Sequence, residues 1–330
     1  MIFIACPEKF ATGGTELLHQ LYFKLTKFTN KVKIFYYDYS GSGNPVNNRF
    51  EKYNVSHVTE IEDNQANILI VPEVATNILG NYYNIKKCVW WLSVDNYFAA
   101  LGIRDNPIKS VILIVKKVLS GEYFKRVVNF KDDQIIHLYQ SFYAKDFLEN
   151  KGVQKLEYLS DYIGSNFLDM KVDFTDNNRL NRVLYNPKKG FEFTRKIIAF
   201  DDNIEFIPLV NMKQDQIIEL CKTSKVYIDF GNHPGKDRFP REAAHLGCIV
   251  ITGKKGSARF EKDVKIPQDY KFNDVNHSIH EIINKILYIF HNYNEEIDFL
   301  NEYRSMIANE ELRFEDDVQK IWDNYFEIYS

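Results

Sequence analysis

Residues 227–253, YIDFGNHPGKDRFPREAAHLGCIVITG, contain the pattern that decides the fold. A short apolar run, 226–230, predicts a strand, and a polar loop with a Pro-Gly pair and several charges follows it. A helix is expected to open near Pro240, and a second apolar run, 248–252, predicts another strand. In an open α/β sheet such a unit binds its ligand where backbone N–H groups converge at the helix start. We therefore expect a binding site here.

The composition is that of a globular chain long enough for two domains. Its 330 residues are 45% apolar and 26% charged, with a formal net charge of -3. That charge gives no electrostatic reason to expect a nucleic-acid partner. The four cysteines lack the spacing of a metal site and indicate a reducing compartment. The sequence shows no signal peptide and no apolar stretch long enough to span a bilayer, so we expect a cytoplasmic protein.

Both halves of the chain alternate predicted strands with helices, which predicts mostly parallel sheets covered on both faces. In the first half, Gly13 and Gly14 open a helix soon after the first apolar run, 1–6. Their spacing is not GxGxxG, so a dinucleotide cofactor is not expected. The second half begins again with a strand and a glycine-bearing loop, 186–190. The predicted boundaries are 1–165 for the first domain, 166–181 for a polar linker, 182–313 for the second domain and 314–330 for a segment that returns to the first.

A basic segment, residues 104–131, interrupts the first half. It carries seven Lys and Arg residues against two acids, around the apolar core 111–115. A basic amphipathic segment of this kind can lie on an anionic membrane surface. A core helix with a solvated basic face would give the same pattern, and both interpretations stay open.

Taken in order, these elements resemble a GT-B glycosyltransferase, and more narrowly the large retaining group of family 4. The resemblance rests on Gly13 and Gly14 after the first strand, on Lys189-Gly190 after a strand of the second domain, and on the run 240–250, PREAAHLGCIV. It covers nearly the whole chain, and its motifs are specific only in combination. It implies an α/β fold of two Rossmann-like domains facing across a cleft, with a C-terminal helix that crosses back to the first domain.

The resemblance implies a donor site in the second domain. Glu242 matches the family's glutamate that binds the donor ribose, and Lys189, beside Lys188, matches the cation that neutralises the diphosphate. Glu242 could instead be a carboxylate that the helix dipole stabilises, and Lys188 and Lys189 could instead belong to a solvated turn. The predicted donor-binding residues are Gly13, Gly14, Asn186, Lys188, Lys189, Lys236, Arg238, Arg241 and Glu242. No metal or other cofactor is expected, because no DxD-type pair lies in a matching loop.

One position departs from the family pattern. The first acid of the family's E-x7-E pair would fall on Pro234. His233 beside it could hydrogen-bond the transferred sugar. Arg238 and Arg241 could hold a phosphate or the carboxylate of an acidic sugar. Each of these three could alternatively be a surface loop residue.

The stereochemistry of the reaction stays open. A retaining enzyme of this fold needs no separate base, whereas an inverting one needs a carboxylate or a histidine near the acceptor. Glu16, Glu73 and Asp95 are the candidates in the first domain, and Asp95 is the best placed. Its alternative role is to cap the next turn. The predicted catalytic residues are Asp95, His233 and Glu16.

The function that the resemblance implies is transfer of a sugar from a nucleotide-activated donor to a glycan or lipid-linked glycan. The pathway would be the synthesis of a bacterial capsule, O-antigen or lipopolysaccharide. If segment 104–131 binds lipid, the enzyme would work at the inner face of the cytoplasmic membrane. Two alternatives stay open: a GT-B epimerase that acts on a sugar nucleotide, and a non-catalytic relative that binds a nucleotide or glycan.

Overall fold

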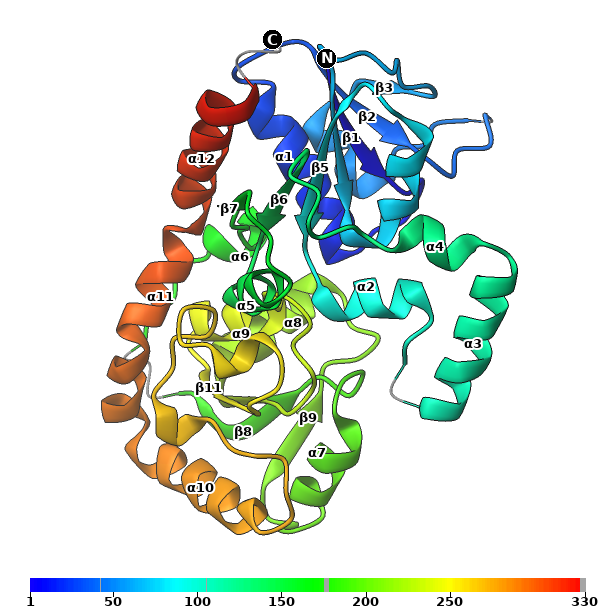
Figure 1. Cartoon of the computed structure of the whole chain (residues 1–330). Coiled ribbons are helices and arrows are strands. Elements are labelled where there is room, and N and C mark those ends of the chain that lie inside the picture. Colours follow the sequence, from blue (N-terminus) through cyan, green and yellow to red (C-terminus); the bar gives the residue numbers. More distant parts are fainter. Residues whose placement is uncertain (42, 105, 175–177, 327–330) are drawn as a thin grey trace. The chain divides into compact units, whose positions relative to one another are not determined.

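The chain forms two compact units in the computed structural model (Figure 1). Unit 1 comprises Met1–Asp161 and Leu312–Ser330, and unit 2 comprises Tyr162–Glu311. The structure describes residues 1–41, 43–104, 106–174 and 178–326. Parts of three predicted segments lie outside the described residues, namely 105 of the basic segment, 175–177 of the linker and 327–330 of the final segment.

Unit 1 is built on a seven-stranded parallel sheet. Its strands are β1 (Ile2–Cys6), β2 (Val32–Tyr36), β3 (His57–Val58), β4 (Ile68–Pro72), β5 (Lys86–Trp91), β6 (Ile135–Tyr139) and β7 (Leu156–Tyr158). Their order in the sheet is β3-β2-β1-β4-β5-β6-β7. The strands β1, β4 and β6 are buried along their whole length, which explains why their sequences are almost continuously apolar.

In the part of unit 1 that the structure describes, five helices connect these strands. They are α1 (Gly13–Leu25), α2 (Val94–Leu101), α3 (Pro107–Leu119), α4 (Glu122–Arg126) and α5 (Phe142–Asn150). Short 3-10 segments add Asn48–Tyr53 and Glu73–Asn81. The side chains of Thr12, Ser93 and Ser141 start α1, α2 and α5, because each accepts a backbone hydrogen bond from the first turn.

The C-terminal segment returns to unit 1. Helix α12 (Glu310–Ile321) leads into a short π-helical turn, Trp322–Phe326. Phe314 stacks on Trp90, with 6.2 Å between the ring centroids. The backbone N–H of Ser160 donates to the carboxylate of Asp317 (3.1 Å). These contacts confirm the predicted return of the last helix.

Unit 2 is built on a smaller parallel sheet. Its strands are β8 (Leu180–Tyr185), β9 (Glu205–Pro208), β10 (Ser224–Asp229) and β11 (Ile249–Thr252), in the order β11-β10-β8-β9. The register pairs Val226 of β10 with Ile249 on one side and Val183 on the other. The helices are α6 (Ser165–Leu168), α7 (Phe191–Ile198), α8 (Gln214–Thr223), α9 (Arg238–His245), α10 (Ser278–Glu296) and α11 (Asn301–Ala308). Two α/β units with parallel sheets confirm the predicted fold class.

The structure adds two details to the sequence-based expectation. The units divide after residues 161 and 311, whereas the predicted first domain ends at 165 and the predicted second domain spans 182–313. Phe167 in the predicted linker 166–181 is buried in the core of unit 2, so this stretch belongs to that unit. Helix α9 begins at Arg238, so Pro240 lies in its first turn, where proline is tolerated.

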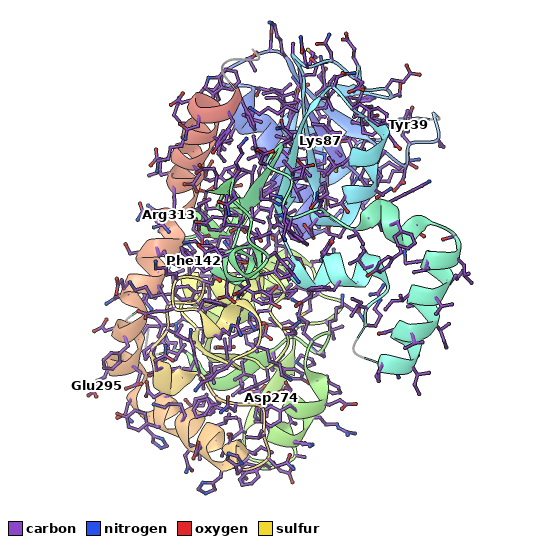
Figure 2. All side chains as sticks on the ribbon, in the orientation of Figure 1. Tyr39, Lys87, Phe142, Asp274, Glu295 and Arg313 are labelled. Atoms are coloured by element: carbon purple, nitrogen blue, oxygen red, sulfur yellow. The ribbon has the colours of Figure 1, made fainter. Side chains whose placement is uncertain are left out.

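Side chains fill the space between sheet and helices in both units (Figure 2). Within the part of the chain that the structure describes, no helix has both the length and the hydropathy to cross a bilayer.

Candidate functional site

The loop between β10 and α9 lies at the carboxyl edge of the unit 2 sheet. Asp229, the last residue of β10, accepts hydrogen bonds from the N–H of Gly231 (2.9 Å) and from the hydroxyl of Tyr227 (3.1 Å). These bonds fix the carboxylate where the chain leaves the sheet. Open α/β sheets bind ligands outside the carboxyl ends of their strands. The structure therefore places the 227–253 pattern at a position suited to ligand binding.

Two loops of unit 2 touch through glycines. Gly190 has a φ of +60°, and a β-carbon on it would lie 2.4 Å from the carbonyl oxygen of Phe230. A β-carbon on Gly231 would lie 2.5 Å from the β-carbon of Lys189. Both positions require glycine, because any side chain would push the loops apart. The contact holds Lys189 against the loop that follows β10.

Four ionisable side chains form a compact network beside this contact. The Lys189 ammonium lies 2.7 Å from Oδ2 of Asp237. Nδ1 of His233 lies 3.5 Å from the same oxygen, and Nε2 of His233 lies 3.5 Å from Oδ1 of Asp229. Burial alone would lower the pKa of His233, but the two carboxylates outweigh it and raise that pKa. Burial alone would raise the pKa of Asp229, but His233 and the Gly231 N–H hold that pKa below its usual value.

Three of these side chains also have the composition of a metal site. Asp229, His233 and Asp237 each offer a ligand atom, and the three atoms lie within 4.8 Å of one another. A metal ion needs a neutral imidazole and available carboxylates. Here the raised pKa favours a proton on His233, and Lys189 pairs with Asp237. The donor set fits a metal poorly, because Lys189 already pairs with Asp237 and the raised pKa of His233 opposes the neutral imidazole that a metal needs. That the protein requires no metal stays a prediction.

A second charge cluster is buried in unit 2. Glu310, the first residue of α12, has one carboxylate oxygen 2.7 Å from the Lys236 ammonium and the other 2.7 Å from Nη1 of Arg241. Arg241 also donates to the backbone carbonyls of Lys236 (2.9 Å) and Asp237 (3.1 Å). The cluster therefore fixes the shape of the loop that leads into α9.

This cluster gives two predicted donor-binding cations a protein partner. Lys236 and Arg241 are both buried, so contact between either side chain and a donor stays a prediction. The sequence did not indicate Glu310, because its partner Arg241 lies 69 residues earlier and no local spacing connects them.

The remaining predicted donor residues lie on the same loops and on α9. Glu242 is the fifth residue of α9 and is largely buried. The helix dipole acts mainly within the first turn, so it does not explain an acid at this position. Arg238 is the first residue of the helix. The Asn186 side chain accepts the N–H of Lys188 (3.1 Å) and shapes the turn that exposes this lysine.

Gly13 and Gly14 form the start of α1 in unit 1. The hydroxyl of Thr12 caps this helix by accepting the N–H of Thr15 (3.3 Å). A β-carbon on Gly14 would meet only ordinary contacts, the nearest 3.7 Å away on Leu92. The fold therefore has room for a side chain at this glycine. Its absence leaves space at a helix start, where N–H groups can face an anion.

The two predicted catalytic acids of unit 1 have protein partners. Glu16 is buried and lies 3.6 Å from the Lys52 ammonium. Asp95 is the second residue of α2 and accepts a hydrogen bond from the Tyr143 hydroxyl (2.9 Å). Ser93 caps α2, which removes the alternative that Asp95 is the cap. The catalytic roles of Glu16 and Asp95 stay predictions.

Glu73 has the more unusual environment. It follows β4 directly, is buried, and accepts the N–H of Leu92 (3.0 Å). Burial raises the pKa of Glu73 to about 8, although backbone hydrogen bonds from Leu92 and Ser93 oppose the shift. A carboxyl group that keeps its proton near neutral pH is a candidate general acid. It lies at the carboxyl edge of the unit 1 sheet.

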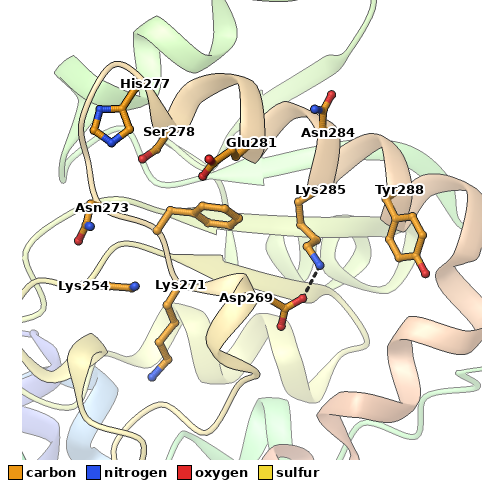
Figure 3. Close-up of a pocket in the computed structure, with 11 residues that line it drawn as sticks. Lys254, Asp269, Lys271, Asn273, His277, Ser278, Glu281, Asn284, Lys285 and Tyr288 are labelled. Carbon is orange, nitrogen blue, oxygen red and sulfur yellow. Dashed lines mark hydrogen bonds and ion pairs between the residues drawn. The ribbon is translucent and has the colours of Figure 1, made fainter.

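Unit 2 also contains a hollow of about 720 Å³ beside the start of α10 (Figure 3). Its lining includes Lys271 and Glu281, and Lys285 reaches the carboxylate of Asp269 at 2.5 Å. All of the predicted donor-binding residues lie outside this lining. The hollow therefore provides a control region within the same unit.

No family model and no curated protein matches the sequence. Solved structures match nearly the whole chain. A glycosyltransferase from Rickettsia africae ESF-5 has 15% identity and a TM-score of 0.63, covering 99% of this chain and 98% of its own. Anabaena HepE in complex with UDP has 9% identity and a TM-score of 0.63, with 98% and 99% covered. WaaG, a glycosyltransferase involved in lipopolysaccharide biosynthesis, has 10% identity and a TM-score of 0.60, with 96% and 99% covered. The predicted GT-B fold is confirmed.

Proposed function

We propose that this protein is a glycosyltransferase of bacterial surface polysaccharide synthesis. It would move a sugar from a nucleotide-activated donor to a glycan or lipid-linked glycan at the inner face of the cytoplasmic membrane. The GT-B fold, shared with glycosyltransferases over nearly the whole chain, supports sugar transfer. The main supporting observation is the close contact at Gly190 and Gly231, which holds Lys189 beside the loop that leads into α9.

Lys189 is the cation proposed to receive the donor diphosphate. As the nucleotide leaves, negative charge develops on its phosphate oxygens, and a fixed cation stabilises that charge. Asp237 holds the ammonium of Lys189 in place at 2.7 Å, and about a third of the lysine side chain is exposed. Lys188, on the loop of Lys189, and Arg238, at the start of α9, add positive charge. Transfer by this arrangement would need no metal.

Glu242 is the residue proposed to bind the donor ribose. A carboxylate has two oxygens that can accept hydrogen bonds from two vicinal hydroxyls, which suits a ribose. His233 is fully buried between two carboxylates, so we assign it a positioning role for Asp237 and Lys189. On the acceptor side, Asp95 or Glu16 would serve as the base of an inverting reaction, and a retaining reaction would need neither.

A nucleotide screen tests the donor part of this proposal. UDP, GDP, CDP, dTDP, CMP and their common sugar conjugates are added one at a time, and the melting temperature is measured. A ligand at about a hundredfold over its Kd stabilises the fold by roughly 2.7 kcal/mol, which raises Tm by several degrees. We expect a response to one base. A cooperative melt that no nucleotide shifts would contradict a nucleotide-sugar donor.

Turnover tests the transferase part. Release of the nucleotide from the responding sugar conjugate should be slow alone and faster with a glycan acceptor. Conversion of the sugar without any acceptor would favour an epimerase. Nucleotide binding without release, with every acceptor tried, would favour a non-catalytic binding protein.

A further inference from the structure

Helix α3 of unit 1 turns an apolar face outward. Its large apolar side chains on that face are exposed, namely Ile108 (72%), Val111 (62%), Ile112 (62%), Val115 (50%), Val118 (37%) and Leu119 (83%). They recur every three or four residues and so form one stripe along the helix. In a helix that covers a core, this stripe would face the core. Here the apolar stripe is exposed to solvent.

The inner face of α3 consists of other residues. Ser110 is buried, and its hydroxyl accepts the N–H of Arg104 (2.7 Å). Leu113 packs so close to the end of α2 that a β-carbon on Gly102 would lie 3.2 Å from it. Lys117 forms an ion pair with a glutamate of α4 at 2.8 Å. These contacts attach α3 to unit 1 and leave the stripe uncovered, and Figure 1 shows the helix standing out from the sheet of this unit.

The charges of α3 complement an anionic surface. The helix contains three lysines and no acid. Lys109 and Lys116 are exposed and, being seven residues apart, follow one edge of the apolar stripe. Lys117 differs, because its ion pair fixes it on the inner side. Exposed Phe124 and Lys125 on α4 repeat the combination of an apolar and a basic side chain.

We propose that α3 is the element by which this protein binds an anionic lipid surface. Its 13 residues make about 20 Å of helix, too short to span the roughly 30 Å hydrocarbon core. A helix of this kind lies in the interface, with its apolar stripe among the acyl chains and its lysines at the headgroups. A second copy of the chain would fit less well, because two such stripes would bring lysines together without acids. This inference deepens the membrane location in the proposed function by naming the helix that makes the contact, and it does not depend on sugar transfer.

Vesicle binding tests the proposal directly. The full chain is sedimented with phosphatidylcholine vesicles with and without about a third of phosphatidylglycerol. We expect binding only to the anionic vesicles, and weaker binding at higher salt. The double variant Ile112→Asp, Val115→Asp should bind at least about tenfold more weakly. Lys109→Gln with Lys116→Gln should lose about fivefold per lysine.

Matched substitutions outside α3 provide the controls. Phe299 is as exposed as Ile112, and Phe299→Asp should leave vesicle binding unchanged. Lys31→Gln with Lys171→Gln removes two exposed lysines elsewhere and should change binding little. Melting curves show whether each variant is folded. Equal binding by the α3 variants and the wild type, or no binding by the wild type, would overturn the proposal.

A tryptophan placed on the stripe reports insertion. Trp90, Trp91 and Trp322 are buried, so Ile112→Trp adds an exposed fluorophore to a shielded background. We expect its emission to shift to the blue on anionic vesicles and to be quenched by brominated lipids. Vesicle binding without either change would overturn the proposed orientation.

Two further measurements separate the other outcomes. Light scattering that shows a dimer, lost in the Ile112→Asp, Val115→Asp variant while vesicles do not bind, would overturn the proposal in favour of a second copy. Sugar transfer to a water-soluble acceptor should be the same in this variant and the wild type. A failure of membrane binding is thereby distinguished from a failure of the proposed enzyme activity.

Discussion

The carboxyl edges of the two sheets use the same residue types in opposite ways. In unit 2, Gly190 has no room for a β-carbon, and the charges at the loop lie in ion pairs. In unit 1, Gly14 has room for a side chain, and Glu73 is buried where its pKa rises. Glycine and an acidic residue near a strand end therefore have different roles in the two units. We interpret the carboxyl edge of the unit 2 sheet as a closely packed site whose charges are paired. We interpret the carboxyl edge of the unit 1 sheet as a site with room for a ligand beside a buried acid.

Removing Glu310 should break the charge balance of unit 2 and have the largest effect. Glu310→Gln leaves Lys236 and Arg241 buried without their carboxylate, and breaking a buried pair in this way costs about 3–5 kcal/mol. Urea unfolding measures the loss. The control is Glu302→Gln, which removes an exposed ion pair with Lys265 and should cost less than about 1 kcal/mol. Equal losses in the two variants would show that the cluster contributes no more than a surface pair.

Glu73 should make unit 1 sensitive to pH. Below pH 4.5 the carboxyl is protonated in both the folded and the unfolded state, so burial carries no ionisation penalty. Between pH 4.5 and about 8 only the unfolded chain releases the proton, so the free energy of unfolding falls as pH rises. Glu73→Gln should abolish this slope and be more stable at pH 7 by on the order of 3 kcal/mol. Unfolding curves of wild type and Glu73→Gln at several pH values measure this dependence. If the free energy of unfolding changes with pH in the same way in both proteins, the pKa of Glu73 is not raised.

Substitution of Gly190 tests whether this glycine, unlike Gly14, is required by the packing around it. Gly190→Ala places a β-carbon against Phe230 in a left-handed conformation, which should cost about 1–3 kcal/mol. It should also weaken nucleotide binding, because the loop that carries Lys189 must move. Thermal unfolding and a nucleotide titration measure the two effects. A variant as stable as the wild type would mean that the loops separate easily.

Gly14→Ala should have the smallest effect on stability. The new methyl group meets only ordinary contacts, and alanine favours a helix over glycine by up to about 1 kcal/mol. The variant should therefore be as stable as the wild type or slightly more stable, but it should turn over the donor more slowly. Unchanged turnover would indicate that no ligand approaches this part of the helix start.

The fold was largely predictable from the sequence, because its buried parallel strands are apolar runs separated by glycine-bearing loops and helix caps. Charge partners far apart in sequence were not predictable. Nothing in the spacing connects Arg241 with Glu310, so the buried partner of this predicted donor-binding arginine could not be foreseen. The amphipathic pattern of α3 was visible, but the pattern does not say which face a neighbour covers. Lys116 and Lys117 looked equivalent, whereas only Lys117 pairs with α4.

The most direct test of the central claim is a calorimetric titration with the nucleotide sugar that stabilises the protein. Wild type is compared with Glu242→Gln on α9 and with Glu281→Gln in the hollow beside α10. We predict affinity at least about tenfold lower for Glu242→Gln, the size of a lost charged hydrogen bond, and wild-type affinity for Glu281→Gln. Unchanged affinity in Glu242→Gln, or a loss confined to Glu281→Gln, would contradict a donor site at the carboxyl edge of the unit 2 sheet.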